Sequence, residues 1–560
     1  SIITSGLSTS SVRRIAIAVT PANSSYVYLL YGSSTDNGLK GIYRSTNSGS
    51  SFTRRDDGTK NLLGWDVDGS DSGGQAWYDL TIAASLTNAE EVVVGGVNSW
   101  KSTNGGSSWS LMTHWYGGGG APDVHADQHD LVYHGTNLYS GNDGGIYRSS
   151  NGGSSWTDLS SNLVIAQQYR LGLSASTSSL IISGHQDNGS NIRSGTSWTN
   201  VVGGDGMDCM IDRTNNNVIY ASVQYGSHRR SDNGGSFFTD ITSGIPSGQG
   251  NGEWISTLRQ DPVTANTIYA GGRTALYRST DKGNNWTALG SPTGSGNILE
   301  FAIAPSNNQI IYAVQIDRIS KSTNGGSTWT SISSGVPVST YSPTYITISN
   351  TDPNKAWVTL SGYSSTSRVY ETTSGGSSWT NITSGLPALP CNTILSVENS
   401  ADDALYVGTD IGVYYRDDNL GAWTLFSTGL PRVSVRDLEI FYPTGLLRAA
   451  TFGRGTWESD LYATNVAPTA DFTGTPTTIY TGESVTFTNT STGNPTSYTW
   501  SFPGAATTSS NATNPTITYN TAGTFDVSLT ATNAFGNDTK TRANYITVTV
   551  LNPPVASFTG

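Results

Sequence analysis

This 560-residue chain is poor in charge and in cysteine, and each scarcity excludes a class of protein. It carries 29 Lys and Arg against 41 Asp and Glu, and the resulting net charge of −12 argues against a nucleic-acid partner. No apolar run approaches the roughly 18 residues of a membrane-spanning helix, so we expect no membrane insertion. The two cysteines, Cys209 and Cys391, fall in distant segments, so we expect two free buried thiols and learn nothing about the compartment.

In contrast, one phrase is abundant: Ser-x-Asn-Gly-Gly-Ser-x-Trp and its looser copies return along most of the chain. The spacing of roughly 40 to 57 residues is the period at which repeats build propellers or solenoids. Trp198 occupies the one gap of double length. The aromatic residues that close the copies are Phe52, Trp109, Trp156, Phe238, Trp286, Trp329, Trp379 and Trp423.

The phrase has a mechanical interpretation as a hairpin turn. Asn104 can accept hydrogen bonds from the backbone of its own turn, and Gly106 supplies a positive φ. Trp109 then opens the next strand and can pack between neighbouring sheets. On these residues the chain resembles the bacterial neuraminidase repeat, or Asp-box, proteins: sialidases, xyloglucan-hydrolysing propellers and sortilin-type propellers. The resemblance implies an all-β propeller and is nearly silent about activity.

The repeats predict ten blades. Candidate innermost strands begin near residues 14, 77, 128, 168, 206, 254, 298, 344, 392 and 435, and the last unit lacks an outer strand. Outer strands often end in a phrase such as Ile382-Thr-Ser-Gly-Leu386, and the chain itself begins Ile3-Thr-Ser-Gly-Leu7. We therefore predict that residues 1–6 complete the last blade of a ten-bladed ring, the sortilin-type arrangement. Two smaller propellers remain the alternative.

Near residue 465 the repeats end, and alternating strands such as 525–530 follow, with apolar residues at period two. Ala470-Asp-Phe472, Val485-Thr-Phe487 and Trp500-Ser-Phe502 resemble a polycystic-kidney-disease (PKD) domain, an immunoglobulin-like sandwich of surface proteins. We expect a propeller over 1–464, a PKD domain over 467–550 and the truncated start of a second PKD repeat over 551–560. The PKD resemblance and the Ser/Thr-rich composition predict a secreted or cell-surface protein.

Histidines and acids cluster in the irregular loops of predicted blades two to five. We expect these loops to share one face and to bind a ligand. The candidate ligand-binding residues are His114, Trp115, Tyr116, Asp123, His185, Gln186, Asp187, Asp205, His228 and Trp254.

Three interpretations of this cluster stay open. His125, Asp127 and His129 alternate along a strand and form a plausible set for a transition metal or a structural divalent cation. Acids could instead flank a glycosidic bond; the catalytic candidates are Asp187, Asp205, Asp208 and Glu253. The third interpretation is structural, with the side chains tying long loops to backbone amides.

Comparison with the families that the chain resembles argues against both sialidase and xyloglucanase activity. The arginine set and the Arg-Ile-Pro stretch of sialidases are missing, since Arg14-Ile15 is followed by Ala16. The xyloglucanase-like enzymes have two catalytic aspartates; here Asp36 lies in a loose copy of the first motif and Thr257 replaces the second acid. The loops around His129, Asp143, His185 and Asp205 resemble large secreted, sortilin-like bacterial propeller proteins, which names no reaction.

The leading hypothesis is a secreted or surface-anchored binding and adhesion protein that presents a propeller face to a glycan or an extracellular protein, with PKD spacers. The first alternative is a polysaccharide-degrading glycoside hydrolase with acids on blades two to five. The second is a subunit of an extracellular fibre or surface layer, in which the chain is its own partner.

Overall fold

The computed structural model describes residues 5–56, 58–292, 296–462, 467–493, 495–533, 536–551 and 555–560. The chain divides into two compact units, Ser1–Ser459 and Asp460–Gly560; the boundary predicted at residues 465–466 lies outside the described residues. Within these ranges the only helical elements are three 3-10 turns, so the all-β expectation is confirmed. No helix among them is long and apolar enough to cross a bilayer. The turns are η1 (Gly118–Gly120), η2 (Ser160–Asn162) and η3 (Gln224–Gly226).

The first unit contains ten antiparallel sheets with strands in chain order, nine of four strands and a last one of three. The inner strands are β1 (Val12–Val19), β5 (Thr81–Ala84), β9 (Gln128–His134), β13 (Gln168–Leu173), β17 (Gly206–Ile211), β21 (Leu258–Gln260), β25 (Ile298–Ile303), β29 (Pro343–Ile348), β33 (Cys391–Ser396) and β37 (Val435–Phe441). The second strands are β2 (Val27–Ser33), β6 (Val92–Gly95), β10 (Asn137–Asn142), β14 (Ile181–His185), β18 (Ile219–Val223), β22 (Ile268–Gly271), β26 (Ile311–Gln315), β30 (Ala356–Leu360), β34 (Leu405–Thr409) and β38 (Leu446–Thr451).

The third strands are β3 (Leu39–Ser45), β7 (Ser99–Ser102), β11 (Gly145–Ser149), β15 (Gly189–Ser194), β19 (Ser227–Ser231), β23 (Leu276–Ser279), β27 (Arg318–Ser322), β31 (Val369–Thr372), β35 (Gly412–Arg416) and β39 (Gly455–Asp460). The outer strands are β4 (Thr53–Arg54), β8 (Ser110–Thr113), β12 (Thr157–Asp158), β16 (Ser197–Val202), β20 (Thr239–Asp240), β24 (Thr287–Ala288), β28 (Thr330–Ser331), β32 (Thr380–Asn381) and β36 (Thr424–Leu425).

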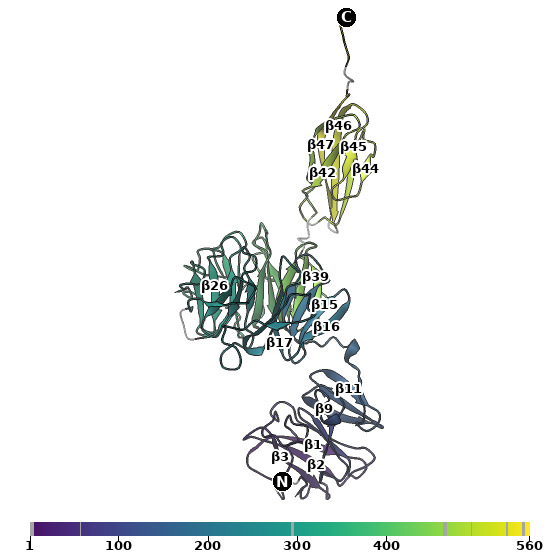
Figure 1. Ribbon diagram of the computed structural model, residues 1–560, viewed down its shortest axis with the longest axis vertical. Coiled ribbons are helices and arrows are strands. Elements are labelled where there is room, and N and C mark those ends of the chain that lie inside the picture. The colour runs from purple at the N-terminus through teal and green to yellow at the C-terminus, as the bar shows by residue number, and fades with distance from the viewer. Residues whose placement is uncertain are drawn as a thin grey trace. The chain divides into compact units, whose positions relative to one another are not determined.

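Seven of the ten sheets, β13–β39, close into a ring, so the predicted ten-bladed ring is wrong. Inner strand β13 packs directly against β37, Gln167 forms a β-bridge with Phe452, and the Gln168 side chain donates a hydrogen bond to Thr456 (2.8 Å). The three remaining sheets, β1–β12, form a separate group through the contacts β1·β5 and β5·β9. Figure 1 shows the two groups, with β1, β3, β9 and β11 in one and β15, β17, β26 and β39 in the other.

The described part of the predicted amino-terminal segment, Ser5 and Gly6, contacts the first sheet and not the last. Residues 1–4 lie outside the described residues, and the carbonyl of Ser5 accepts a hydrogen bond from the backbone N–H of Phe52 in the first sheet (3.0 Å). The same bond joins the Trp423 N–H to the Ser384 carbonyl (2.9 Å), where it links a sheet to its predecessor. The Thr-Ser-Gly-Leu phrase therefore contacts the following sheet wherever it occurs.

The repeated phrase forms the hairpin turn that the sequence predicts. Ser102 Oγ accepts the N–H of Gly106 (2.9 Å), and Asn104 Oδ1 accepts the N–H of Ser108 (2.9 Å). Gly106 has φ 88°, which favours glycine. In ring copies the closing indole bonds to the preceding sheet: Trp423 Nε1 donates to the Ile382 carbonyl (2.7 Å). The turn thus joins one sheet to the next.

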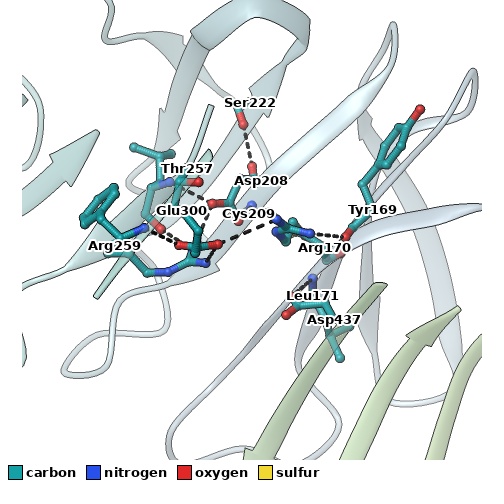
Figure 2. A network of polar contacts seen from close by, with 12 residues as sticks. Tyr169, Arg170, Leu171, Asp208, Cys209, Ser222, Thr257, Arg259, Glu300 and Asp437 are labelled. Atoms are coloured by element: carbon teal, nitrogen blue, oxygen red, sulfur yellow. Dashed lines mark hydrogen bonds and ion pairs between the residues drawn. The ribbon is translucent and has the colours of Figure 1, made fainter. Parts of the chain in front are cut away.

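A buried ionic network joins inner strands of the ring (Figure 2). Arg259 donates to Asp208 (2.9 Å) and to Glu300 (2.8 Å), and Arg170 lies 3.6 Å from Glu300. Burial raises the pKa of Glu300 to about 7, against the opposing effect of the two arginines. The network contains both signs of charge, as buried ions require.

Two acids of this network also bond to the backbone of a neighbouring sheet. Asp208 on β17 accepts the N–H of Leu258 on β21 (2.7 Å). Asp437 on β37 accepts the N–H of Leu171 on β13 (3.0 Å), which is the contact that closes the seventh sheet onto the first. At these two junctions a side-chain carboxylate, and not a strand pair, carries the hydrogen bond from one sheet to the next.

The second unit is a sandwich of two sheets, which confirms the immunoglobulin-like expectation. In β46 the residues Val527, Leu529 and Ala531 are buried at period two, and Trp500 and Phe502 stack in the core. One sheet contains β40 (Phe472–Thr475), β42 (Ser484–Asn489) and β45 (Thr516–Thr518); the other contains β41 (Thr478–Tyr480), β47 (Gly536–Thr549), β46 (Gly523–Asn533), β43 (Ser497–Ser501) and β44 (Ser509–Ser510).

We predict that Asp437→Ala destabilises the ring. The substitution leaves the buried Leu171 N–H without its acceptor, which costs roughly 1–3 kcal/mol, and it removes a negative charge close to Arg170. Differential scanning calorimetry should show a lowered unfolding transition for the propeller, while the PKD transition is unchanged. Asp402→Ala, on an exposed acid, is the matched control; equal melting of the two variants would contradict closure through Asp437.

Candidate functional site

A cavity of about 740 Å³ lies between the β9–β12 sheet and the first sheet of the ring. It collects acids and amides from hairpin turns that are far apart in the sequence. Its lining residues are Tyr78, His129, Asn142, Asp143, Gly144, Gly145, Ser160, Leu163, Ile165, Ala166, Gln167, His185, Gln186, Asp187, Asn188, Asn191 and Asn200.

Asp143 stands at the tip of the hairpin between β10 and β11. His129 Nε2 donates to its Oδ1 (2.7 Å) and the Tyr78 hydroxyl donates to its Oδ2 (2.8 Å), so both carboxylate oxygens are held. Gly144 follows because a Cβ there would lie 2.5 Å from Cβ of His125. The turn therefore fixes the orientation of the Asp143 carboxylate, and the glycine lets the turn pack closely against His125.

Asp187 stands at the tip of the hairpin between β14 and β15, on the ring side of the cavity. Its backbone has φ 57°, a left-handed conformation that costs a non-glycine residue free energy. Asp205 accepts the Asp187 N–H (2.8 Å), and His125 Nε2 donates to the Asp187 carbonyl (3.2 Å). Asn188 Nδ2 donates to the Asp143 carbonyl (3.1 Å). These bonds fix the Asp187 turn against the Asp143 turn.

Two further acids lie beneath this pair. Asp127, also left-handed with φ 64°, accepts a hydrogen bond from Gln75 Nε2 (2.9 Å). Asp79 is fully buried, and neither of its carboxylate oxygens accepts a hydrogen bond within the described part of the chain. One fully buried and three half-buried carboxyl groups thus lie close together at this cavity.

Burial, mutual repulsion and hydrogen bonding give these four carboxyl groups different pKa values. Burial, reinforced by Asp127, raises the pKa of Asp79 to about 9. Burial, reinforced by Asp143 and Asp205, raises the pKa of Asp187 to about 8. Burial also raises the pKa of Asp127, to about 6. For Asp143 burial is outweighed by hydrogen bonds from His129 and Tyr78, which lower its pKa. At neutral pH Asp143 is ionised while Asp187 and Asp79 are largely protonated.

The geometry also suits a divalent cation. Oxygen atoms of Asp127, Asp143 and Asp187 lie within 4.8 Å of one another, and carboxylates are the ligands of hard cations. Of the predicted His125, Asp127 and His129 set only Asp127 belongs to this group. The two histidines are bonded to the Asp187 carbonyl and to Asp143 respectively, so they lie beside this group of acids, and the His-Asp-His metal site stays a prediction.

Other predicted ligand-binding residues do reach the cavity. His185, Gln186 and Asp187 line it, and Asp205 contacts it through the Asp187 backbone. Burial lowers the pKa of His185 to about 4, so this imidazole is neutral.

Several candidates lie elsewhere. His228 is fully buried and Asp208 belongs to the ring network, so neither meets a ligand in the cavity. Glu253 and Trp254 line a different cavity, on the ring axis. The remaining four lie on the β5–β8 sheet and its loop outside the cavity lining, with His114 itself buried: His114, Trp115, Tyr116 and Asp123.

The residues aligned with the xyloglucanase-like aspartates have structural contacts. Asp36 accepts the N–H of Gly38 in its own turn (3.1 Å), and Thr257 donates to the Leu299 carbonyl (3.1 Å). Neither lines the cavity.

Sequence reasoning missed Tyr78, Asp79 and Asp143 as site residues. Asp143 had a signal, because its Gly-Asn-Asp-Gly-Gly turn was part of the resemblance to sortilin-like bacterial proteins. Asp79 lies in an unremarkable segment before β5, and only its burial distinguishes it.

Comparison with known proteins agrees with the fold. Residues 274–410 match the family model described as "Sortilin, neurotensin receptor 3", and residues 465–548 match the PKD domain. These matches cover one segment of the ring and most of the second unit, and they agree with the expected resemblance to sortilin-type propellers and PKD domains. The xyloglucanase of Hypocrea jecorina (strain QM6a) is 29% identical over 198 residues, or 30% of this chain. The chain spans only 24% of that protein.

Among solved structures, the GH74 enzyme of Niastella koreensis shares 18% identity over 79% of this chain and 83% of its own, with a TM-score of 0.30. PorZ, a bacterial surface component of the type-IX secretion system of Porphyromonas gingivalis, shares 13% over 95% and 81%, with a TM-score of 0.33. Likenesses this distant say nothing about activity.

We predict that Asp79→Asn stabilises the first unit at alkaline pH. The folded protein keeps the Asp79 proton up to about pH 9, whereas the unfolded chain loses it near pH 4. The folded state therefore binds more protons between these values, and this acid makes stability fall as pH rises. Asparagine removes this pH dependence of stability. The melting temperature of the variant, compared with that of the unaltered protein, should therefore be higher at pH 8 than at pH 4, measured in the presence of a chelator. The exposed Asp66→Asn is the control; an equal gain in both would contradict the prediction.

Proposed function

We propose that the cavity between the Asp143 and Asp187 turns is the active site of a glycoside hydrolase that acts on a polysaccharide. The observation that carries the proposal is that Asp143 and Asp187, on two separate hairpin tips, line one cavity and have oxygens within 4.8 Å of each other. Their environments shift the two pKa values in opposite directions, up for Asp187 and down for Asp143. Pairs of carboxyl groups held in different protonation states divide the acid and base roles of glycosidic bond cleavage.

The roles follow from the environments. Asp187 would donate its proton to the leaving oxygen of the glycosidic bond. Asp143, which has an oxygen within 4.8 Å of one of Asp187, would act as the nucleophile or stabilise the developing positive charge on the sugar. His129 and Tyr78 position Asp143, since each bonds one of its oxygens. The strained backbone of Asp187 fits a residue held for function rather than for stability.

Two observations favour a polysaccharide substrate. The local similarity to a xyloglucanase supports one class of chain, a substituted glucan. Trp77 is 55% exposed beside the lining residue Tyr78, where an indole can stack on a sugar ring. Polysaccharides are met outside the cell, so we place the protein in a secreted or surface-bound setting, with the PKD unit as a spacer.

A second candidate function is glycan or protein binding without cleavage, on another surface. Trp115 and Tyr116 are 46% and 61% exposed and meet nearly perpendicular with ring centroids 4.7 Å apart. Such an exposed aromatic pair supports adhesion, to which the cavity acids would contribute nothing. Assembly into a fibre or surface layer stays a prediction.

We predict that Asp187→Asn and Asp143→Asn each lower polysaccharide hydrolysis by at least about a hundredfold, because general acid–base catalysis contributes roughly 10²–10⁴ in rate. Reducing-end release from xyloglucan and a panel of other polysaccharides is the measurement. Asp123→Asn, an exposed acid outside the cavity lining, is the control. If the unaltered protein retains a polysaccharide but releases no reducing ends, the result favours the binding function. In that case Trp115→Ala should abolish retention.

We further predict a rate that is constant over acidic to neutral pH and falls near pH 8. The proton donor must be protonated, so activity disappears as Asp187 ionises at a pKa of about 8. Asp143 must be ionised, and its lowered pKa places that loss below the ordinary range of a carboxyl group. Initial rates from pH 3 to 10 check the profile; an alkaline limb that persists in Asp187→Glu with unchanged position would assign it to another group.

A further inference from the structure

A second cavity of about 470 Å³ lies on the axis of the seven-sheet ring, apart from the acid cluster. Several of its walls share one origin: Tyr169, Leu299, Thr344, Asn392 and Arg436 are each the second residue of an inner strand. In all five strands the register with the second strand shifts at this residue, so each is bulged out of the strand pairing. Bulges re-aim side chains, and here they direct one residue from each of five sheets to one cavity.

Arg436 is an unpaired cation in this cavity. Its side chain makes no hydrogen bond and no ion pair with any residue that the structure describes, and its buried Nε is left without an acceptor. The guanidinium lies over the ring of Phe452, 5.2 Å from the centroid. Burial lowers the pKa of Arg436, against the opposing field of Asp410, yet an arginine remains charged at any physiological pH. A half-buried cation with free donors calls for an anion.

A second arginine, Arg170, lies beside Arg436 in the wall of this cavity. Arg170 also lines the cavity, is 8% exposed, and has an Nε without an acceptor. Its Nη atoms are occupied by the carbonyls of Tyr169 and Arg436 and by Glu300. The one acid in the lining, Glu253, accepts a hydrogen bond from Asn297. The lining therefore offers one guanidinium group without a partner in the described chain, Arg436, and one already engaged, Arg170, against one engaged carboxylate.

Apart from the Ser342 hydroxyl, the rest of the lining is apolar or already bonded. Thr344 Oγ1 donates to the Cys391 carbonyl, 2.5 Å away, and Asn392 Nδ2 donates to Asp410 (3.0 Å). Few polar groups remain for the hydroxyls of a sugar. Aromatic and aliphatic side chains complete the walls: Tyr169, Trp254, Ile255, Leu299, Ile316 and Pro343.

We propose that this axial cavity binds a small organic carboxylate with an apolar body, the carboxylate on Arg436 and the apolar body against Trp254 and Leu299. Guanidinium groups match carboxylates in shape and charge, and a cavity of this size accommodates a small molecule. The site is separate from the proposed hydrolase centre and does not depend on that function.

The test is isothermal titration of the full chain with acetate, butyrate and 3-phenylpropanoate, each paired with its neutral amide. We expect affinity to rise with the apolar body and the amides not to bind. Arg436→Gln should weaken 3-phenylpropanoate by about tenfold or more, because a charge-assisted hydrogen bond is lost, and Arg436→Lys should fall between. The exposed Arg432→Gln is the matched control, and calorimetric melting verifies folding of each variant.

Three results would overturn the proposal: no carboxylate binds, the amides bind as well as the acids, or Arg436→Gln and Arg432→Gln weaken binding equally. Binding that survives Arg436→Lys but not Arg436→Gln would support it, since charge without the planar fork retains part of the attraction.

Discussion

The ring depends on buried acids that accept backbone hydrogen bonds from the next sheet. Blades of a propeller share no strand pairing, so something other than a β-ladder must join them. Asp437 does this between β37 and β13, and Asp208 between β17 and β21. Arg170 and Arg259 neutralise these acids on the axis. The same network explains why closure occurs after seven sheets, since the first and last of these seven carry complementary groups.

Each of the two cavities lies where the backbone departs from regular strand geometry. Hairpin tips at Asp143 and Asp187 face one another where the three-sheet group meets the ring, and their positive backbone angles and short glycine contacts serve that approach. The axial cavity instead arises from bulges at a repeated position of the inner strands. One site is acidic and the other carries Arg436, which has no hydrogen bond or ion pair with the described residues, so the two sites suit ligands of different charge.

Much of the candidate site was visible in the sequence, but its chemistry was not. The loops with His185, Gln186, Asp187 and Asp205 were recognised as irregular and functional, and they meet at one cavity. His228 had the same local appearance, yet it is fully buried. A residue's exposure depends on the sheet packed over it, which neighbouring residues in the chain do not encode.

The sequence by itself determined the repeat, the four-stranded sheets, the hairpin turns and the sandwich, because each rests on local periodicity or on turn chemistry. Only the tertiary structure decided how many sheets close and which acids converge. Ring closure is a contact between residues such as Leu171 and Asp437, and the acidity of Asp79 or Asp187 arises from burial beside other carboxyl groups. Both are properties of distance in space, and identical local phrases occur inside and outside the ring.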